Sequence, residues 1–260
     1  MTLHNITALT GHSSSPGAIL QDGIKAAAAS FFFPHYFSAE LANSAQQREA
    51  CFRLRHKVYC EELGFEPIKP DRLETDWFDN RAWHACISHT QKQQLAGTVR
   101  VITSTSRSEL LPIEHNFGAL ITNPVLAPQN FDRQHICEIS RLAVPANIRR
   151  NQLGDDGNRT TEQQCYRQVA VALYLIATQL CLQTNRHHSF VMIEPALARI
   201  LRRIGIHFIQ IGETTKYNGL RAPYYLDMRT TKVTLTAEYL QLRTSLAKQL
   251  NNSTEQQYIA

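Results

Sequence analysis

Glu138 and Arg141 are the two residues with the clearest potential for chemistry. Both lie in the otherwise apolar segment 135–144, which has the composition of a buried strand and ends at Pro145. A carboxylate in such a setting can act as a general base, for instance by taking a proton, through water, from an ammonium group with a pKa of about 8. The two side chains could equally form a structural ion pair, and their types alone leave both interpretations open.

The spacing of Glu138 and Arg141 sets a condition for any shared site. Successive side chains of a regular strand point to opposite faces, so two residues three apart lie on opposite sides of the sheet. Both can face one site only if a β-bulge lies between them, and bulges are common next to active sites. We therefore predict an irregularity in this strand.

Other charged and aromatic residues could join the same site. Arg100 ends a strand-like segment, and Arg55 and Tyr59 are four residues apart, which places them on one face of a helix. Asp76 and Asp79 lie in an acidic loop and could be turn residues instead. Arg55 could likewise be a solvated charge, and Tyr59 a core aromatic.

Four short motifs together resemble one enzyme family. RHKVYCEELGF from Arg55, DWFD from Asp76, GTVR ending at Arg100 and EISR from Glu138 resemble the N-terminal half of the autoinducer (acyl-homoserine lactone) synthases. Longer stretches such as LRHKVYCEELGFEP, CEISRLAVP and YNGLRAPYYLD are more similar to acyltransferases associated with PEP-CTERM/exosortase systems. The resemblance covers positions 37 to 228. It places the chain near the N-acyl amino acid synthases, in the GNAT-like acyltransferase superfamily.

The resemblance implies a fold and a set of site residues. In the GNAT-like fold the acyl-thioester arm lies in a wedge between two splayed central strands, here expected at 135–144 and 188–193. The implied catalytic residues are Glu138, Arg141 and Arg100. The residues implied to bind substrate are Arg55, Tyr59, Phe65, Asp76, Asp79, Leu142 and Val144. A backbone N–H near Leu142–Val144 would stabilise the developing oxyanion.

The loop Arg149–Asn158 bears on the acyl donor. GNAT enzymes usually hold the pyrophosphate of coenzyme A with a Q/R-x-x-G-x-G/A loop, whereas this loop reads RRNQLGDDGN and places two acids where phosphates would approach. This departure favours acyl carrier protein over acyl-CoA as the donor. The arginines implied to dock the carrier are Arg149, Arg150, Arg199, Arg202 and Arg203, although the last three could form a solvated helix face.

The implied function is an N-acyltransferase that moves a fatty acyl chain from acyl carrier protein, or from acyl-CoA, to the amine of a small acceptor such as an amino acid. No tightly bound cofactor is implied. Two alternatives stay open: an acyl-homoserine lactone synthase acting on S-adenosylmethionine, and a non-catalytic GNAT-like module that binds acyl carriers. Phe65, where the synthases usually have Trp, counts against the first. The complete set of charged motif residues counts against the second.

A zinc site is a further alternative. His84 and Cys86 share one strand face, as do His135 and Cys137, and His187–His188 lies near them in a similar segment. Such ligands could hold zinc, but their spacing is not that of a zinc module. Each pair also lies in a strand that needs core residues, so we expect no metal.

Composition excludes several other classes. The 260 residues are 43% hydrophobic and 19% charged, which is typical of a globular protein. No apolar run reaches the roughly 18–20 residues that span a bilayer. The net charge of +5 comes without a basic block, which argues against a nucleic-acid partner. Six cysteines without a CxxC pair indicate a reducing compartment, and we expect a cytoplasmic protein; Lys25–Ala39 resembles a signal peptide only faintly.

Apolar periodicity and turn signals predict the order of elements. They predict strands at 34–41, 82–89, 94–103, 135–144, 188–193, 206–211 and 223–228, with irregular turns over 106–133. Helices are predicted at 44–63, at 195–204 and at 233–250. A further helix is predicted from Thr160 or Thr161 onward, where a glutamine three residues later completes a capping box and an apolar stripe follows. This order fits an α+β fold with one mixed sheet and flanking helices. We expect a single domain at 26–250, between a flexible leader at 1–25 and a polar tail at 251–260.

Overall fold

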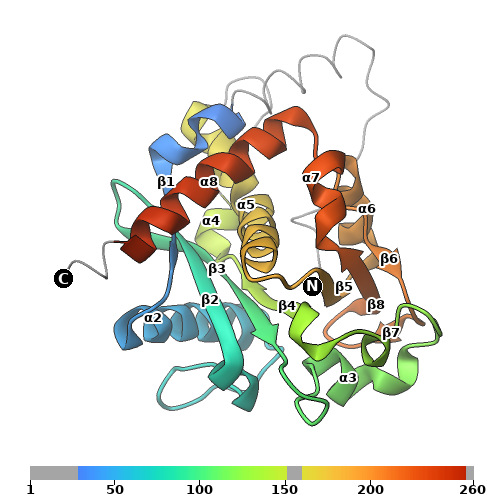
Figure 1. Ribbon diagram of the computed structural model, residues 1–260. Coiled ribbons are helices and arrows are strands. Elements are labelled where there is room, and N and C mark those ends of the chain that lie inside the picture. The colour runs from blue at the N-terminus through green and yellow to red at the C-terminus, as the bar shows by residue number, and fades with distance from the viewer. Residues whose placement is uncertain (1–28, 151–159, 256–260) are drawn as a thin grey trace.

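The computed structural model describes residues 29–150 and 160–255, which form one mixed sheet with helices on both faces (Figure 1). The predicted leader and all but the first two residues of the loop Arg149–Asn158 lie outside these residues. The strands follow the order β1-β2-β3-β4-β5-β8-β6, and β7 pairs with β8. Their bounds are β1 Phe37–Leu41, β2 Ala82–His89, β3 Gln94–Thr103, β4 Ile136–Ala143, β5 His188–Ile193, β6 Ile209–Gln210, β7 Thr215–Lys216 and β8 Leu220–Asp227.

The central strands part after a short stretch of parallel pairing. β4 and β5 pair only at Ile136↔His188, Cys137↔Ser189 and Glu138↔Phe190. Beyond Glu138, β4 continues to pair with β3, and β5 continues to pair with β8. The predicted splay between these two strands is therefore confirmed.

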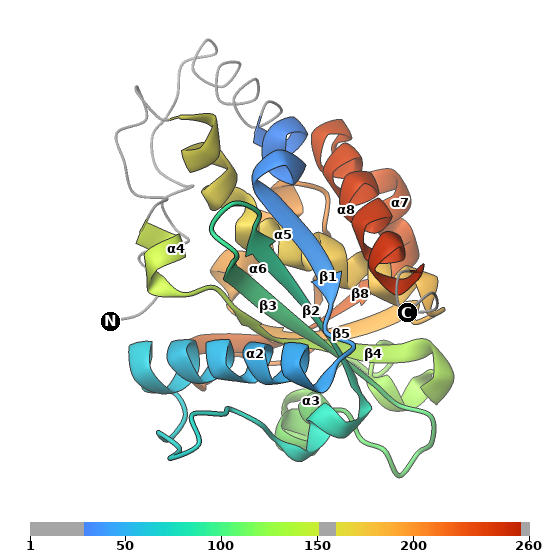
Figure 2. The same ribbon diagram turned by 90° about the vertical axis from the view of Figure 1, so that its left-hand side faces the viewer.

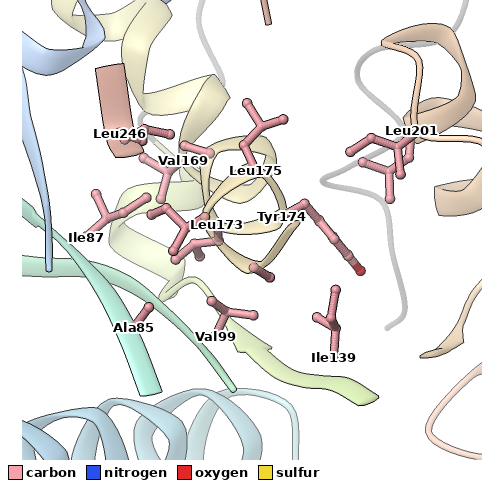
Figure 3. Close-up of a cluster of buried hydrophobic side chains, with 14 of the residues drawn as sticks. Ala85, Ile87, Val99, Ile139, Val169, Leu173, Tyr174, Leu175, Leu201 and Leu246 are labelled. Carbon is pink, nitrogen blue, oxygen red and sulfur yellow. The ribbon is translucent and has the colours of Figure 1, made fainter. Parts of the chain in front are cut away.

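α5, Thr161–Gln183, is the core helix of the fold. Thr160 and Gln163 form the predicted capping box at its start, and its apolar side chains pack onto the sheet with residues such as Val99 and Ile139 (Figure 3). α8, Ala237–Glu255, packs beside it. By length and composition α5 could cross a membrane, unlike any other helix in the described ranges. However, 72% of its most apolar window is buried within the fold.

α2, Ala45–His56, covers the opposite face of the sheet from α5 and α8 (Figure 2). It starts at the capping box of Ser44 and Gln47. The sequence predicts one helix to residue 63, but the chain changes to a wider π-helix at Lys57–Glu62. π-Helical turns are often found at functional sites, and this one carries Tyr59.

Several element boundaries differ from the sequence predictions. Residues 29–36 are helical, and they bury Phe33 next to β1, so the first strand begins later than predicted. Segment 106–133 contains a short helix, α3 Pro112–Phe117, that contributes to a second apolar cluster around Phe190. β6 is shorter than predicted and β8 starts earlier. The remaining helices are α4 Ala146–Arg150, α6 Pro195–Arg203 and α7 Thr231–Thr234, and α8 starts and ends later than predicted.

Candidate active site

The predicted bulge is present in β4. Thr98 pairs with Ala143 and Arg100 pairs with Ser140, so β4 has one residue more than β3 between these two pairs. Arg141 sits in this interval with a φ of +49°, in the left-handed region. The extra residue changes the direction in which the Arg141 side chain leaves the strand.

Glu138 and Arg141 consequently lie on the same side of the sheet. The guanidiniums of Arg100 and Arg141 both reach Asp76, at 2.7 Å and 3.6 Å, so they share a face. Arg100 Nε also donates to Ser140 Oγ at 3.1 Å, and Ser140 is two residues from Glu138 in the strand. Within the described part of the chain no ion pair joins Glu138 to Arg141.

Arg55 is the centre of a buried charge network. Its side chain is fully buried, and its Nε donates to Glu74 at 2.5 Å. Its two terminal nitrogens donate to Asp79 at 2.7 and 3.1 Å. Asp79 also accepts from Arg100 at 2.7 Å, and Glu74 accepts from Arg141 at 3.0 Å. Buried charges need such partners, so the interpretation of Arg55 as a solvated charge is wrong.

Asp76 and Asp79 have two functions at once. They form the capping box of a 3₁₀ helix, Trp77–Arg81, in which Asp76 accepts from Phe78 N at 3.0 Å and Asp79 accepts from Asp76 N at 2.9 Å. They are therefore turn residues and members of the network. Burial raises the pKa of Asp79, but hydrogen bonds from Arg55 and the charge of Arg100 outweigh it and hold this pKa well below its usual range.

Glu66, Glu74 and His84 also belong to this network, although no sequence pattern predicts their contacts. Glu66 accepts from Arg141 at 3.1 Å, and Glu74 bridges two arginines; a loop without periodicity gives no signal for either contact. The buried His84 ring lies 3.6 Å from an Asp79 oxygen. Burial lowers the pKa of His84 to about 4, so its ring is neutral in the network.

Glu138 is set apart from the ion pairs. Its side chain is almost fully buried, and Oε2 accepts a hydrogen bond from Ile113 N, at the start of α3, at 2.7 Å. Burial raises the pKa of Glu138 to about 8, and the hydrogen bond from Ile113 and the charges of Arg100 and Arg141 oppose this rise only in part. Glu138 can therefore gain and lose a proton near neutral pH.

Tyr59, in the π-helix, contacts the bulge of β4. Its hydroxyl donates to the carbonyl oxygen of Leu142 at 2.7 Å, and the guanidinium of Arg141 lies over its ring at 5.6 Å. Phe65 is half-buried and lies just after the π-helix. Its backbone N donates to Tyr59 O at 2.7 Å. Val144 is buried in the core below.

The sequence model of the N-acyl amino acid synthase FeeM family matches residues 50–229, which is more than half of the chain. This chain belongs to the FeeM family. It is an N-acyltransferase. No curated protein sequence matches it.

Solved structures similar to this FeeM-family protein share its fold. FeeM, an N-acyl amino acid synthase from uncultured soil microbes, is 15% identical with a TM-score of 0.54, over 78% of this chain and 97% of FeeM. BjaI, a CoA-dependent acyl-homoserine lactone synthase, is 17% identical with a TM-score of 0.57, over 82% of this chain and 90% of BjaI. The synthase LasI is 16% identical with a TM-score of 0.55, over 77% and 94%. The predicted GNAT-like fold is confirmed.

The five arginines predicted to dock a carrier protein differ in their surroundings. Arg149 is half-buried and pairs with Glu62 at 2.6 Å. Glu62 also accepts from Ala146 N, so this ion pair ties α4 to the π-helix of the FeeM-family protein. The other four, Arg150, Arg199, Arg202 and Arg203, are exposed.

The two His-x-Cys motifs lie in different environments. His84 belongs to the charge network, while Cys137 is buried with its sulfur 3.3 Å from Cys181 Sγ. His135 stacks on His187 with ring centroids 5.7 Å apart. Over residues 29–150 and 160–255 no group of three or more potential metal ligands is found.

Proposed function

We propose that this N-acyltransferase transfers a fatty acyl group from an acyl carrier protein thioester to the amine of an amino acid. The observation that carries the proposal is Glu138, a buried carboxyl with its pKa raised to about 8, located where β4 and β5 part. A base that is partly ionised near neutral pH can take a proton from the ammonium group of the acceptor, which must lose one before the amine can attack.

The reaction needs a proton acceptor and an oxyanion donor. The acceptor's ammonium group loses a proton to the Glu138 carboxylate, directly or through water. The freed amine forms a C–N bond to the thioester carbon, the C–S bond breaks, and the thiol leaves with a proton. Beyond Glu138 the edge of β4 that faces β5 has no strand partner, so backbone N–H groups near Leu142–Val144 can stabilise the oxyanion.

The open end of the charge network supports an amino acid as the acceptor. Glu66, Asp76 and Arg141 are each about one quarter to one fifth exposed, at 26%, 25% and 21%. This end offers carboxylates for an ammonium group and a guanidinium for a carboxylate. S-adenosylmethionine has the same two groups, which makes acyl-homoserine lactone synthesis the second candidate.

The donor is proposed from surface charge. Carrier proteins are acidic, the chain has a net charge of +5, and Arg199, Arg202 and Arg203 are exposed on α6, directly after β5. Two synthases of similar fold, MesI and BjaI, are described as CoA-dependent, so acyl-CoA is the competing donor. Association with PEP-CTERM/exosortase systems rests on sequence resemblance alone. The six free cysteines support a cytoplasmic location.

The test is a product assay with purified protein. Acyl carrier protein or coenzyme A loaded with fatty acyl chains is incubated with a mixture of amino acids and S-adenosylmethionine, and the products are identified by mass spectrometry. We expect N-acyl amino acids, and loss of product with Glu138→Gln. Acyl-homoserine lactone as the only product would favour the second candidate. Donor binding without any transfer would favour a binding module.

A further inference from the structure

The hydroxyl of Tyr174 on α5 keeps a little solvent exposure, although the residue as a whole is buried. Its residue is 4% exposed, and its ring packs edge-on to Phe208 at 6.4 Å. No described residue forms a hydrogen bond with its hydroxyl. A tyrosine hydroxyl in this position is available to donate a hydrogen bond to a ligand.

The hydroxyl of Tyr174 points toward the splay between β4 and β5. In Figure 3 its oxygen points away from the other core side chains, on the side of Ile139. Ile139 is the first residue of β4 beyond the pairing with β5. The groups that act on the Tyr174 phenol electrostatically are Arg221, Tyr59 and Glu194.

Those three groups come from both sides of the splay. Tyr59 is hydrogen-bonded to β4, whereas Glu194 follows β5 and Arg221 lies in β8, which pairs with β5.

The Tyr174 ring packs against Phe208, which packs against Tyr224 of β8. The Tyr174 oxygen lies on the side of Ile139 of β4 (Figure 3), so the phenol lies between the two groups of strands. The burial that isolates it raises the pKa of Tyr174 far above neutral, so the group stays protonated and can donate a hydrogen bond.

We propose that Tyr174 is a donor-binding residue, whose hydroxyl donates a hydrogen bond to a carbonyl oxygen of the acyl thioester in the wedge. The proposal rests on the proposed function in taking an acyl thioester as the donor. Such a donor carries two kinds of carbonyl oxygen, one in the thioester and others in the amides of its pantetheine arm. Both accept the same hydrogen bond, and the experiment distinguishes them.

The experiment measures the binding of unreactive donor analogues by calorimetry. One analogue is acyl carrier protein whose phosphopantetheine thiol carries an S-(2-oxoalkyl) thioether, which keeps a carbonyl next to the reacting position. The other is an S-alkyl thioether, which lacks it. We expect Tyr174→Phe to weaken binding about 3- to 10-fold, as for one lost hydrogen bond. Loss with the oxoalkyl analogue alone identifies the thioester carbonyl, and equal loss with both identifies an arm amide.

Tyr166→Phe is the matched control. Tyr166 lies on the same helix, but its hydroxyl accepts from Lys92 Nζ at 2.8 Å, at the turn between β2 and β3. This variant should bind both analogues like the wild type. Tyr174→Phe should not lower the midpoint of thermal unfolding, because it removes a hydroxyl that has no partner in the folded protein.

The outcomes separate this inference from the proposed function. Suppose that the wild type binds the analogues and that Tyr174→Phe weakens this binding, but that no product forms from acyl-thioester donors. Only the proposed function then fails. If the wild type forms product and Tyr174→Phe keeps the affinity for both analogues, the inference is overturned. A wild-type protein that binds neither analogue also overturns it.

Discussion

Tyr59 holds the bulge of β4 in place through Leu142, whose carbonyl oxygen accepts its hydroxyl at 2.7 Å. The two residues are 83 positions apart, so this bond joins the π-helix to the strand that carries Glu138 and Arg141. The resemblance implies that Tyr59 binds substrate. The bond to Leu142 also gives it a positioning role.

Tyr59→Phe should therefore lower turnover without removing any catalytic group. Loss of the hydroxyl leaves the Leu142 carbonyl without this partner, which should cost about 1–3 kcal/mol of unfolding free energy. We expect kcat to fall about 10-fold while KM for the acceptor changes little, as for an interaction that acts mainly in the transition state. Tyr217→Phe, at an exposed tyrosine, is the control. Wild-type kcat in Tyr59→Phe would show that the bond does not position the bulge.

Arg55→Ala should destabilise the fold strongly. It removes the cation between Glu74 and Asp79, both nearly buried, and breaking such a pair typically costs about 3–5 kcal/mol. Arg53→Ala is the matched control on the same helix, because Arg53 is 54% exposed and pairs with exposed Glu49. Its cost should be about 0.5 kcal/mol or less. Urea unfolding measures both, and similar costs for the two variants would contradict the buried network.

The rate of transfer should rise with pH up to about 8. Only the ionised form of Glu138 acts as a base, and its pKa is raised to about 8 by burial. Glu138→Gln should lower kcat by about 10²–10⁴-fold and remove this dependence. The control is an acceptor whose amine has a lower pKa. If Glu138 is the base, the rise of the rate with pH stays at about 8 with this acceptor. A rise that moves with the pKa of the acceptor would argue against Glu138.

The same carboxyl should make stability depend on pH. Its pKa of about 8 in the folded protein lies above the ordinary value of 4.5, so the folded state binds the proton more tightly. The stability from this group is full below pH 4.5 and is lost as the pH rises to 8, by about 1.4 kcal/mol per pH unit. Glu138→Gln should remove that slope. The pKa of Asp79 is lowered, so its contribution to stability is lost as the pH falls into the acid range.

Charge reversal on α6 should discriminate between the two donors. Arg202→Glu with Arg203→Glu should lower kcat/KM for acyl carrier protein and leave that for acyl-CoA unchanged. The effect should shrink with added salt, since exposed charges act mainly on association and are screened beyond about 8–10 Å. Reversal of Arg107 and Lys232, also exposed, is the control with the same change in net charge. Unchanged kcat/KM for both donors, with no salt dependence, would indicate a solvated helix face.

The parts of the structure with strong local signals were predictable from sequence. The capping box at Thr160 and the apolar stripe after it located α5, and alternating segments located the β2–β3 hairpin and β4. The bulge followed from the odd spacing of Glu138 and Arg141, because only an irregular strand can turn both to one side.

Other features depend on contacts between distant segments. Nothing near Glu74 in the sequence indicates that it bridges Arg55 and Arg141, since its partners come from α2 and β4. Tyr174 follows Leu173 in an apolar helix, where an aromatic residue predicts core packing. Only the arrangement of the strands reveals that its hydroxyl points to the splay.

The short pairing between β4 and β5 affects how easily the sheet opens locally. Three residue pairs join the group of strands β1–β4 to the group β5, β8 and β6. By comparison, β4 pairs with β3 at five positions and β5 pairs with β8 at six. The boundary between the groups should therefore open at a lower free energy than either group unfolds. Amide protons along this edge of β4 should exchange faster than those shared with β3. Such transient opening would let a long, flexible chain enter sideways, with no need to thread through a rigid channel.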